Sequence, residues 1–140
     1  MTEPKLFIAT KAFIVHNNKV LVLRESNKYS DGTQLGNYDV PGGRMKPGET
    51  WEQNLLREVK EETGMNVKVG APFAVGEWRP VVKGEQWQIV AIFLECFSDS
   101  DKVTLSDDHD DFLWIDPKAY SKYPMPPKNL PAFEKYISRI

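Results

Sequence analysis

Short apolar stretches alternate with polar turns at the beginning of the chain. Residues 6–15 and 20–23 are rich in β-branched and aromatic side chains, a composition typical of β-strands. Asn17 and Asn18 lie between the two stretches, and such polar pairs signal a turn. The pattern therefore predicts a β-hairpin at the start of the fold.

The same reasoning predicts further strands and loops along the chain. In order, these are a polar loop over 24–37, a short strand over 38–40, an extended segment over 67–78 with a break at Pro72, a turn over 83–85, an apolar strand over 87–97, an acidic loop over 98–111 and a short strand over 112–115.

The clearest helix signal covers residues 51–63. Thr50 is a favourable N-cap and Gln53 follows three residues later, so the two predict a capping box. Gly64 comes after the last helical residues and suits a left-handed C-terminal cap.

The C-terminal part begins with a short helical turn at 116–117. Prolines cluster over 124–131 and predict a rigid, irregular connection. An amphipathic helix is expected at the end, because four apolar residues follow helical spacing: Phe133, Tyr136, Ile137 and Ile140. Strands outnumber the helices that are interleaved with them, so we expect one α/β layered domain over residues 1–140, with a mixed β-sheet between helices.

Composition and charge narrow the function classes. The 140 residues carry 18 Lys and Arg against 20 Asp and Glu, a formal net charge of −2, so stable nucleic-acid binding through a basic surface is not expected. Cys96 is the one cysteine, which excludes an intramolecular disulfide and fits a reducing compartment. The apolar runs are too short to cross a bilayer and the N-terminus lacks signal-peptide features. We therefore expect a cytoplasmic protein without a membrane partner.

Three carboxylates share one side of the predicted helix. At 3.6 residues per turn, Glu58, Glu61 and Glu62 fall within an arc of about 100°. A stripe predicted to face the core lies beside them, formed by Leu55, Leu56 and Val59. Like charges this close repel, and a bound hard cation such as Mg²⁺ or Mn²⁺ would relieve the repulsion. The alternative, an acidic face exposed to solvent, stays open on these residues alone.

The surrounding residues form a longer motif. From Gly43 to Met65 the chain reads GRMKPGETWEQNLLREVKEETGM. This resembles the Nudix box, G-x5-E-x7-R-E-U-x-E-E-x-G-U, where U is a bulky aliphatic residue. Every specified position fits, and Met65 is the loosest match because Ile, Leu or Val is usual there. The chain thus resembles the Nudix hydrolases, and in particular the small MutT-like members of that family.

The resemblance implies a fold, a reaction and a set of site residues. The fold would be a Nudix-type α/β/α sandwich, and the reaction a Mg²⁺-dependent attack of water on a pyrophosphate linkage. By position, the implied metal ligands are Glu58, Glu61, Glu62 and the carbonyl of Gly43. Glu49 and Arg57 resemble the ion pair that braces the box in this family.

The general base is left open between the box and a later loop. Glu58 and Glu61 are the catalytic candidates in the box. Asp108, in the acidic stretch before the strand predicted at 112–115, stands where relatives often carry a glutamate. Aspartate is one methylene shorter, and an acidic loop exposed to solvent is an equally good interpretation of Asp108.

Candidates for substrate contacts come from predicted strand ends and aromatic positions. Arg24, Tyr38 and Arg79 are the residues proposed to bind substrate. Core or sheet packing is the default expectation for Trp78 and Trp87. His109 is expected to be exposed, and Cys96, in an apolar strand without basic neighbours, is expected to be a buried thiol.

The primary hypothesis is a pyrophosphohydrolase acting on a nucleoside triphosphate, oxidised ones included. Alternatives are an ADP-ribose or dinucleotide pyrophosphatase, a nucleotide-sensing module that does not hydrolyse its ligand, and an RNA-decapping enzyme. The complete box disfavours the sensing module, and the lack of basic excess disfavours the decapping enzyme. A homodimer is compatible with the sequence, which carries no interface signature.

Overall fold

The computed structural model describes residues 3–26 and 36–140. Most of the loop predicted over 24–37 lies outside the described residues. The described strands are β1 (Lys5–His16), β2 (Lys19–Glu25), β3 (Tyr38–Asp39), β4 (Gly42–Arg44), β5 (Lys68–Trp78), β6 (Val81–Val82), β7 (Glu85–Phe97) and β8 (His109–Ile115). The helices are α1 (Trp51–Thr63) and α2 (Leu130–Ile137), with 3₁₀ helices η1 (Pro117–Lys122) and η2 (Pro127–Asn129) ahead of α2.

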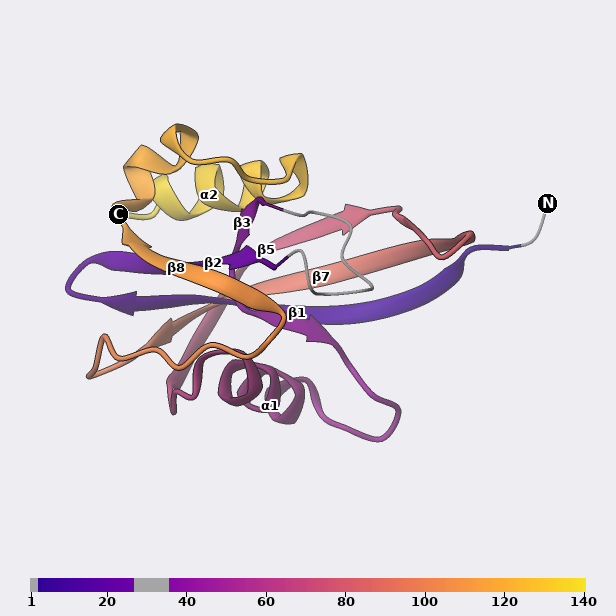
Figure 1. Cartoon of the computed structure of the whole chain (residues 1–140), viewed down its shortest axis with the longest axis horizontal. Coiled ribbons are helices and arrows are strands. Elements are labelled where there is room, and N and C mark those ends of the chain that lie inside the picture. The colour runs from indigo at the N-terminus through magenta and orange to yellow at the C-terminus, as the bar shows by residue number, and fades with distance from the viewer. Residues whose placement is uncertain (1–2, 27–35) are drawn as a thin grey trace.

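A mixed β-sheet forms the middle of the molecule (Figure 1). Its main path runs β3-β2-β1-β7-β5, with β4 paired to β1, β8 to β2 and β6 to β7. The long central strands β1 and β7 are parallel, whereas the other pairings are antiparallel. The predicted mixed sheet is therefore confirmed.

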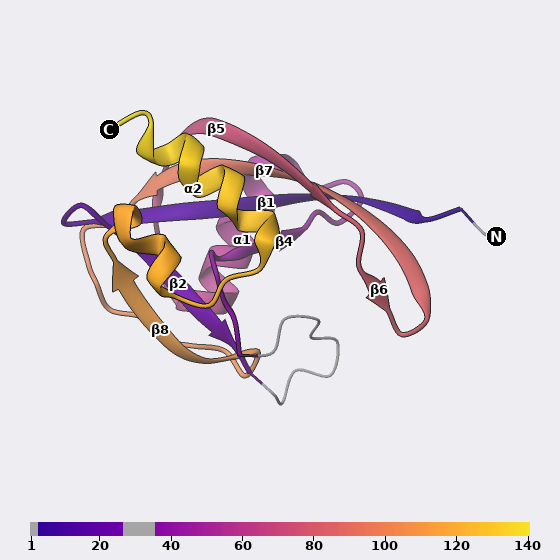
Figure 2. The ribbon, with the colours of Figure 1, turned by 90° about the horizontal axis from the view of Figure 1, so that it is seen from above.

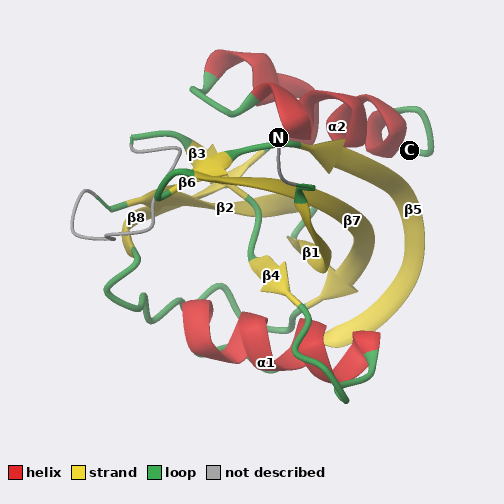
Figure 3. Ribbon diagram, turned by 90° about the vertical axis from the view of Figure 1, so that its right-hand side faces the viewer, coloured by secondary structure: helices red, strands yellow, loops and turns green. Residues whose placement is uncertain are grey.

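The helices lie on opposite faces of the sheet, as Figure 3 shows with α1 below and α2 above. Successive residues of a strand point to opposite faces. In β1, Ala12 and Ile14 accordingly pack in the core beneath α1, and Phe13 packs with Phe133 and Tyr136 of α2. Two apolar cores thus flank the sheet, and the expected α/β/α sandwich is confirmed.

The predicted hairpin and helix caps are also confirmed. Asn17 and Asn18 both have positive φ, at 51° and 63°, which suits the tight turn between antiparallel β1 and β2. At the start of α1 the Thr50 hydroxyl accepts from the Gln53 backbone N–H at 3.1 Å, while the Gln53 side chain accepts from the Thr50 N–H at 2.9 Å. Gly64 closes the helix at φ 70°.

The prediction of a core-facing stripe on α1 is wrong for one of its three residues. Leu55 and Val59 are fully buried, but Leu56 is 38% exposed. Asn54 is buried instead, and its side chain accepts from the Thr10 hydroxyl and donates to the Arg44 carbonyl oxygen. These hydrogen bonds turn the polar side of the first helical turn toward the sheet, and Leu56 is thereby left near the solvent.

Proline positions account for two further corrections. Pro72 does not break the extended segment, because β5 continues through it with shifts of register against β7 on either side. An edge strand tolerates a residue without an N–H. The 124–131 segment is not wholly irregular, since it holds η2 and the beginning of α2. That helix buries Phe133 and Tyr136 but ends before Ile140, which is 63% exposed.

The end of the sheet formed by β5, β6 and β7 extends beyond α2 when seen from above (Figure 2). This leaves one end of the sheet face free of helix cover, next to β4 and α1. None of the helices in the described residues is long and apolar enough to cross a membrane.

Candidate active site

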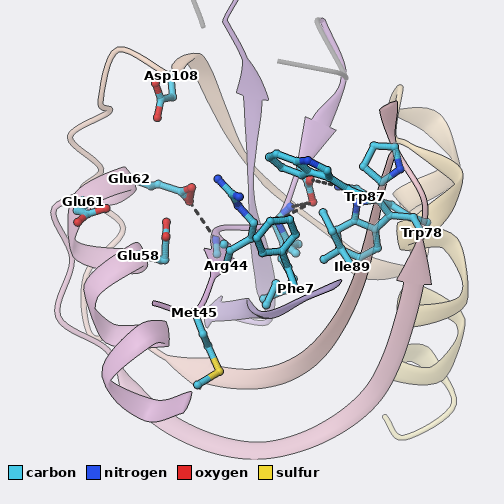
Figure 4. A pocket seen from close by; sticks show the side chains of 18 of the residues that line it. Phe7, Arg44, Met45, Glu58, Glu61, Glu62, Trp78, Trp87, Ile89 and Asp108 are labelled. Atoms are coloured by element: carbon cyan, nitrogen blue, oxygen red, sulfur yellow. Dashed lines mark hydrogen bonds and ion pairs between the residues drawn. The ribbon is translucent and has the colours of Figure 1, made fainter. Parts of the chain in front are cut away.

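A cavity of about 570 Å³ lies at this end of the sheet. Its volume falls in the range of sites that take small molecules. Figure 4 shows its two unlike sides, an acidic wall from α1 and an apolar half that includes Phe7, Trp78, Trp87 and Ile89. The site is therefore built for a ligand with a charged part and an apolar part.

The acidic wall contains the three predicted metal-binding carboxylates. Glu58 and Glu62 project from α1 toward the cavity and Glu61 lies at its outer edge (Figure 4). Burial raises the pKa of Glu62 to about 8, although the charge of Lys11 opposes the shift. Burial also raises the pKa of Glu58. Raised pKa values at adjacent carboxylates mean that added positive charge is favourable here.

Glu49 and Arg57 form the ion pair that the motif predicts. The Arg57 guanidinium donates from Nε and Nη2 to the two carboxylate oxygens of Glu49, at 2.8 and 2.9 Å. The Lys46 backbone N–H donates to the same carboxylate at 2.8 Å, and these hydrogen bonds lower the pKa of Glu49 to about 2. The pair thus ties the loop before α1 to the middle of the helix.

The two glycines before Arg44 allow very close backbone approach. A Cβ at Gly42 would lie 2.1 Å from the Thr10 carbonyl oxygen, so β4 could not pair with β1 at this distance with any larger residue. A Cβ at Gly43 would lie 2.7 Å from the carboxyl carbon of Glu58. Glycine at position 43 therefore makes room for the Glu58 carboxylate on the cavity side of the helix.

The donor set fits a hard cation, although the oxygens are not gathered around one point. In the described ranges, 3–26 and 36–140, no three acidic, histidine or cysteine side chains lie close enough together to hold a metal ion as they stand. Glu58 and Glu61 are turned to the Arg57 guanidinium, at 3.2 and 3.3 Å, and Glu62 accepts from the Gly42 N–H at 3.0 Å. Metal binding would require these side chains to turn away from their present partners.

The three residues predicted to bind substrate do not line the cavity. Arg24 donates to Asp110 at 2.7 Å, and the hydroxyl of the buried Tyr38 donates to Asp111 at 2.8 Å. Arg79 is paired with Glu77 at 2.9 Å on the surface. Each side chain is thus engaged with an acidic neighbour outside the cavity wall.

Two residues of the acidic loop and two tryptophans also line the cavity. Asp108 lines the cavity, and so does His109, which was expected to be exposed but is only partly exposed. Burial lowers the pKa of the His109 imidazole. Trp78 and Trp87 pack against the apolar core, as expected. They also line the cavity, where the Arg44 guanidinium lies 4.3 Å from the centre of the Trp87 ring. Cys96 is buried as predicted, and burial raises the pKa of its thiol to about 12.

The sequence reasoning missed a buried ionic cluster on the cavity wall. Asp39 lies 3.4 Å from the Lys11 ammonium and 3.2 Å from that of Lys128, and it also accepts from the Asn129 amide at 2.8 Å. A signal was present for Lys11, because it alternates with Ala9 and Phe13 on the inward side of an apolar strand. Nothing local in the sequence marks Lys128, which comes from η2.

A layered fold whose acidic helix carries the motif of residues 43–65 beside an open cavity matches one class of protein, the Nudix hydrolases. The family model described as NUDIX domain matches residues 5–136. The chain therefore belongs to the Nudix family, whose members hydrolyse pyrophosphate bonds.

Individual relatives show how closely the chain follows known members. It is 25% identical to the CTP pyrophosphohydrolase of Escherichia coli (strain K12) over 134 residues, which cover 96% of this chain and 93% of the relative. It is 33% identical to the nucleoside triphosphatase NudI of Enterobacter sp. (strain 638), over 73% of this chain and 77% of the relative. The crystal structure of a MutT protein from Methanosarcina mazei Go1 superposes with a TM-score of 0.84 at 24% identity, covering 99% of this chain and 98% of that one.

Proposed function

We propose that this protein is a Mg²⁺-dependent pyrophosphohydrolase of nucleoside triphosphates, with Mn²⁺ as an alternative cation. One observation carries the proposal. The same cavity has a wall of three carboxylates on one side and aromatic rings on the other. A nucleotide has the same two parts, since its phosphates are anionic and its base is flat and apolar on both faces.

An anionic substrate does not enter an acidic wall unaided. A divalent cation supplies the missing positive charge, polarises phosphate oxygens and lowers the pKa of a bound water. Glu58, Glu61 and Glu62, with the Gly43 carbonyl, are the residues that would hold it. The Glu49–Arg57 pair fixes α1 against the loop that joins it to β4, the strand of Gly43, which would help to position this donor set.

The proposed reaction is the hydrolysis of a phosphoanhydride bond. The water oxygen forms a bond to phosphorus while the bridging P–O bond breaks, and its electron pair stays on the leaving phosphate. A proton of the water passes to a carboxylate, for which Glu58, Glu61 and Asp108 all line the cavity. The products are two phosphate compounds, a nucleoside monophosphate and pyrophosphate or a nucleoside diphosphate and phosphate.

Relatives support the choice of a nucleoside triphosphate. The CTP pyrophosphohydrolase covers nearly the whole chain, and NudI, named a nucleoside triphosphatase, covers about three quarters of it. ADP-ribose and dinucleoside polyphosphates are the competing substrates, and they also offer a base for the aromatic half.

The test is a substrate panel read out by product identity. Purified protein with Mg²⁺ is incubated with the common and the oxidised nucleoside triphosphates, ADP-ribose, nucleoside diphosphate sugars and dinucleoside polyphosphates. We expect the triphosphates to be cleaved with the highest kcat/KM, and Glu58→Gln to lower kcat at least about 10²-fold. Glu52→Gln is the matched control, because Glu52 lies on the same helix, exposed and outside the cavity. Faster cleavage of ADP-ribose, or full activity of the Glu58 variant, would contradict the proposal.

A further inference from the structure

Lys11 is a lysine in a place where lysines are rare. It lies in the middle of the central strand β1, opposite Gly42 of β4 and Phe93 of β7, and is only 7% exposed. Burying an ammonium is costly unless it is paired or has another task. Because both neighbouring strands hold the backbone on either side, the position of this charge is fixed by the sheet.

Within the described residues, 3–26 and 36–140, the pairing of Lys11 is incomplete. Its contact with Asp39 Oδ1 is long, at 3.4 Å, and that oxygen already accepts from the Val40 N–H at 2.7 Å and the Asn129 amide at 2.8 Å. The other oxygen of Asp39 pairs with Lys128 at 3.2 Å. One carboxylate is therefore shared by two ammonium groups. An ammonium carries three N–H donors, and one long contact engages at most one of those of Lys11.

Lys11 also lies where the two halves of the cavity meet. Glu62, on the acidic wall, is hydrogen-bonded to the N–H of Gly42, the residue directly opposite Lys11 in the sheet. Toward the aromatic half of the cavity, Ala9 and then Phe7 lie on the same face of β1 as Lys11, because alternate residues of a strand share a face. In a nucleotide, the atoms between the metal-bound phosphates and the base are the ribose and the phosphoryl group attached to it.

We propose that Lys11 is a catalytic residue whose ammonium donates to a non-bridging oxygen of the phosphoryl group attached to the nucleoside, and that Asp39 is its positioning residue. The inference rests on the proposed nucleotide substrate. A preorganised cation at this oxygen stabilises the negative charge that builds up as the phosphoryl group reacts. The location at the junction explains why the strand carries lysine, since an apolar residue would satisfy packing alone.

Lys11→Met is the decisive variant, with Lys60→Met as the matched control on the solvent side of α1. We expect Lys11→Met to lower kcat about 10²-fold, by a similar factor for CTP and for GTP, because the lost contact is to phosphate rather than to base. Lys11→Arg retains the charge and should recover part of the loss. Thermal unfolding of each variant shows whether the fold persists, which we expect since Asp39 keeps Lys128 and Asn129.

A binding measurement separates a phosphate contact from a structural role without relying on turnover. Calorimetry with CMP and cytidine, and with GMP and guanosine, measures how much affinity the phosphoryl group adds. We expect that gain to fall at least tenfold in Lys11→Met and to be unchanged in Lys60→Met. Equal weakening of nucleotide and nucleoside, no change in either, or no phosphate-dependent gain in the wild-type protein would each overturn the assignment. Failure of the wild-type protein to cleave any triphosphate would instead refute the proposed function, which the substrate panel tests separately.

Discussion

The guanidinium of Arg57 holds both carboxylate oxygens of Glu49, eight residues earlier in the chain, in a two-pronged hydrogen bond of 2.8 and 2.9 Å. The Nη1 group of the same arginine reaches Glu58 and Glu61. One side chain therefore links the loop before α1 to two of the three carboxylates on the acidic wall. A flexible lysine offers one point charge in place of this planar fork.

Arg57→Lys should accordingly reduce activity while leaving the protein folded. Loss of the second hydrogen bond loosens the loop between β4 and α1, so Glu58 on α1 is held less firmly relative to the Gly43 carbonyl on β4. We expect kcat to fall about tenfold or more, with a higher Mg²⁺ concentration needed for half-maximal rate. Arg139→Lys is the control, since that arginine is exposed near the C-terminus and does not line the cavity. Equal activity of the Arg57 and Arg139 variants would show that the fork has no role in catalysis.

Replacing the two adjacent glycines of β4 by alanine should have different effects, on stability at Gly42 and on activity at Gly43. At Gly42 the new Cβ meets backbone, the Thr10 carbonyl oxygen at 2.1 Å, and φ is 142°, so we expect a large loss of stability. At Gly43 the new Cβ meets the Glu58 carboxyl group, the far end of a flexible side chain. Gly43→Ala should therefore stay folded but displace that carboxylate, and lose about tenfold or more in activity.

Thermal unfolding and Mg²⁺ titration of the same two proteins check this contrast. Gly42→Ala is expected to lower Tm strongly, whereas Gly43→Ala should change Tm little and raise the Mg²⁺ requirement. A Gly43→Ala protein with wild-type metal dependence would mean that Glu58 does not need its present place beside Gly43.

Asp39 should make the fold sensitive to acid. Burial alone would raise its pKa, but Lys11, Lys128 and the Asn129 amide together hold the pKa of this carboxyl well below its ordinary value. Such a group contributes stability above its unfolded pKa, near 3.9, and the contribution is lost as the pH falls through the lower, folded value. Asp39→Asn removes this contribution and leaves the ammonium groups of Lys11 and Lys128 without their carboxylate. We expect it to lower the free energy of unfolding by about 3 kcal/mol at pH 7.

Urea unfolding from pH 7 down to pH 2.5 measures both effects. The wild-type protein should lose stability steeply below about pH 4, and the gap between wild type and Asp39→Asn should narrow over the same range. A gap that stays constant with pH would show that Asp39 is not ionised in the folded protein.

The sequence predicted local structure better than the cavity. Capping residues and the asparagine turn act on their immediate neighbours, so Thr50, Gln53 and the Asn17–Asn18 pair could be interpreted one by one. The arc of Glu58, Glu61 and Glu62 follows from helical geometry and needs no tertiary information either. Arg24 and Tyr38 illustrate the limit, because their acidic partners come from β8, more than 70 residues away along the chain.

Long-range assembly also explains the residues that were missed. Lys11, Asp39 and Lys128 come from β1, β3 and η2, and only the folded sheet brings them together. The aromatic half is built in the same way, from β1, β5 and β7. The apolar pattern placed Trp78 and Trp87 in strands, but it did not show that both side chains line a cavity.

Trp87 offers a direct test of the aromatic half. Its ring lies 4.8 Å from that of Phe7 and carries the Arg44 guanidinium on its face at 4.3 Å. Stacking of a base on an aromatic side chain contributes about 1–3 kcal/mol. Trp87→Leu keeps an apolar side chain but loses the flat ring, so we expect KM for nucleoside triphosphates to rise about tenfold with a smaller change in kcat. Trp51→Leu is the matched control, because Trp51 is 43% exposed at the start of α1 and does not line the cavity. Steady-state kinetics of both variants decide the point: a rise in KM common to both, or absent from Trp87→Leu, would place the base elsewhere.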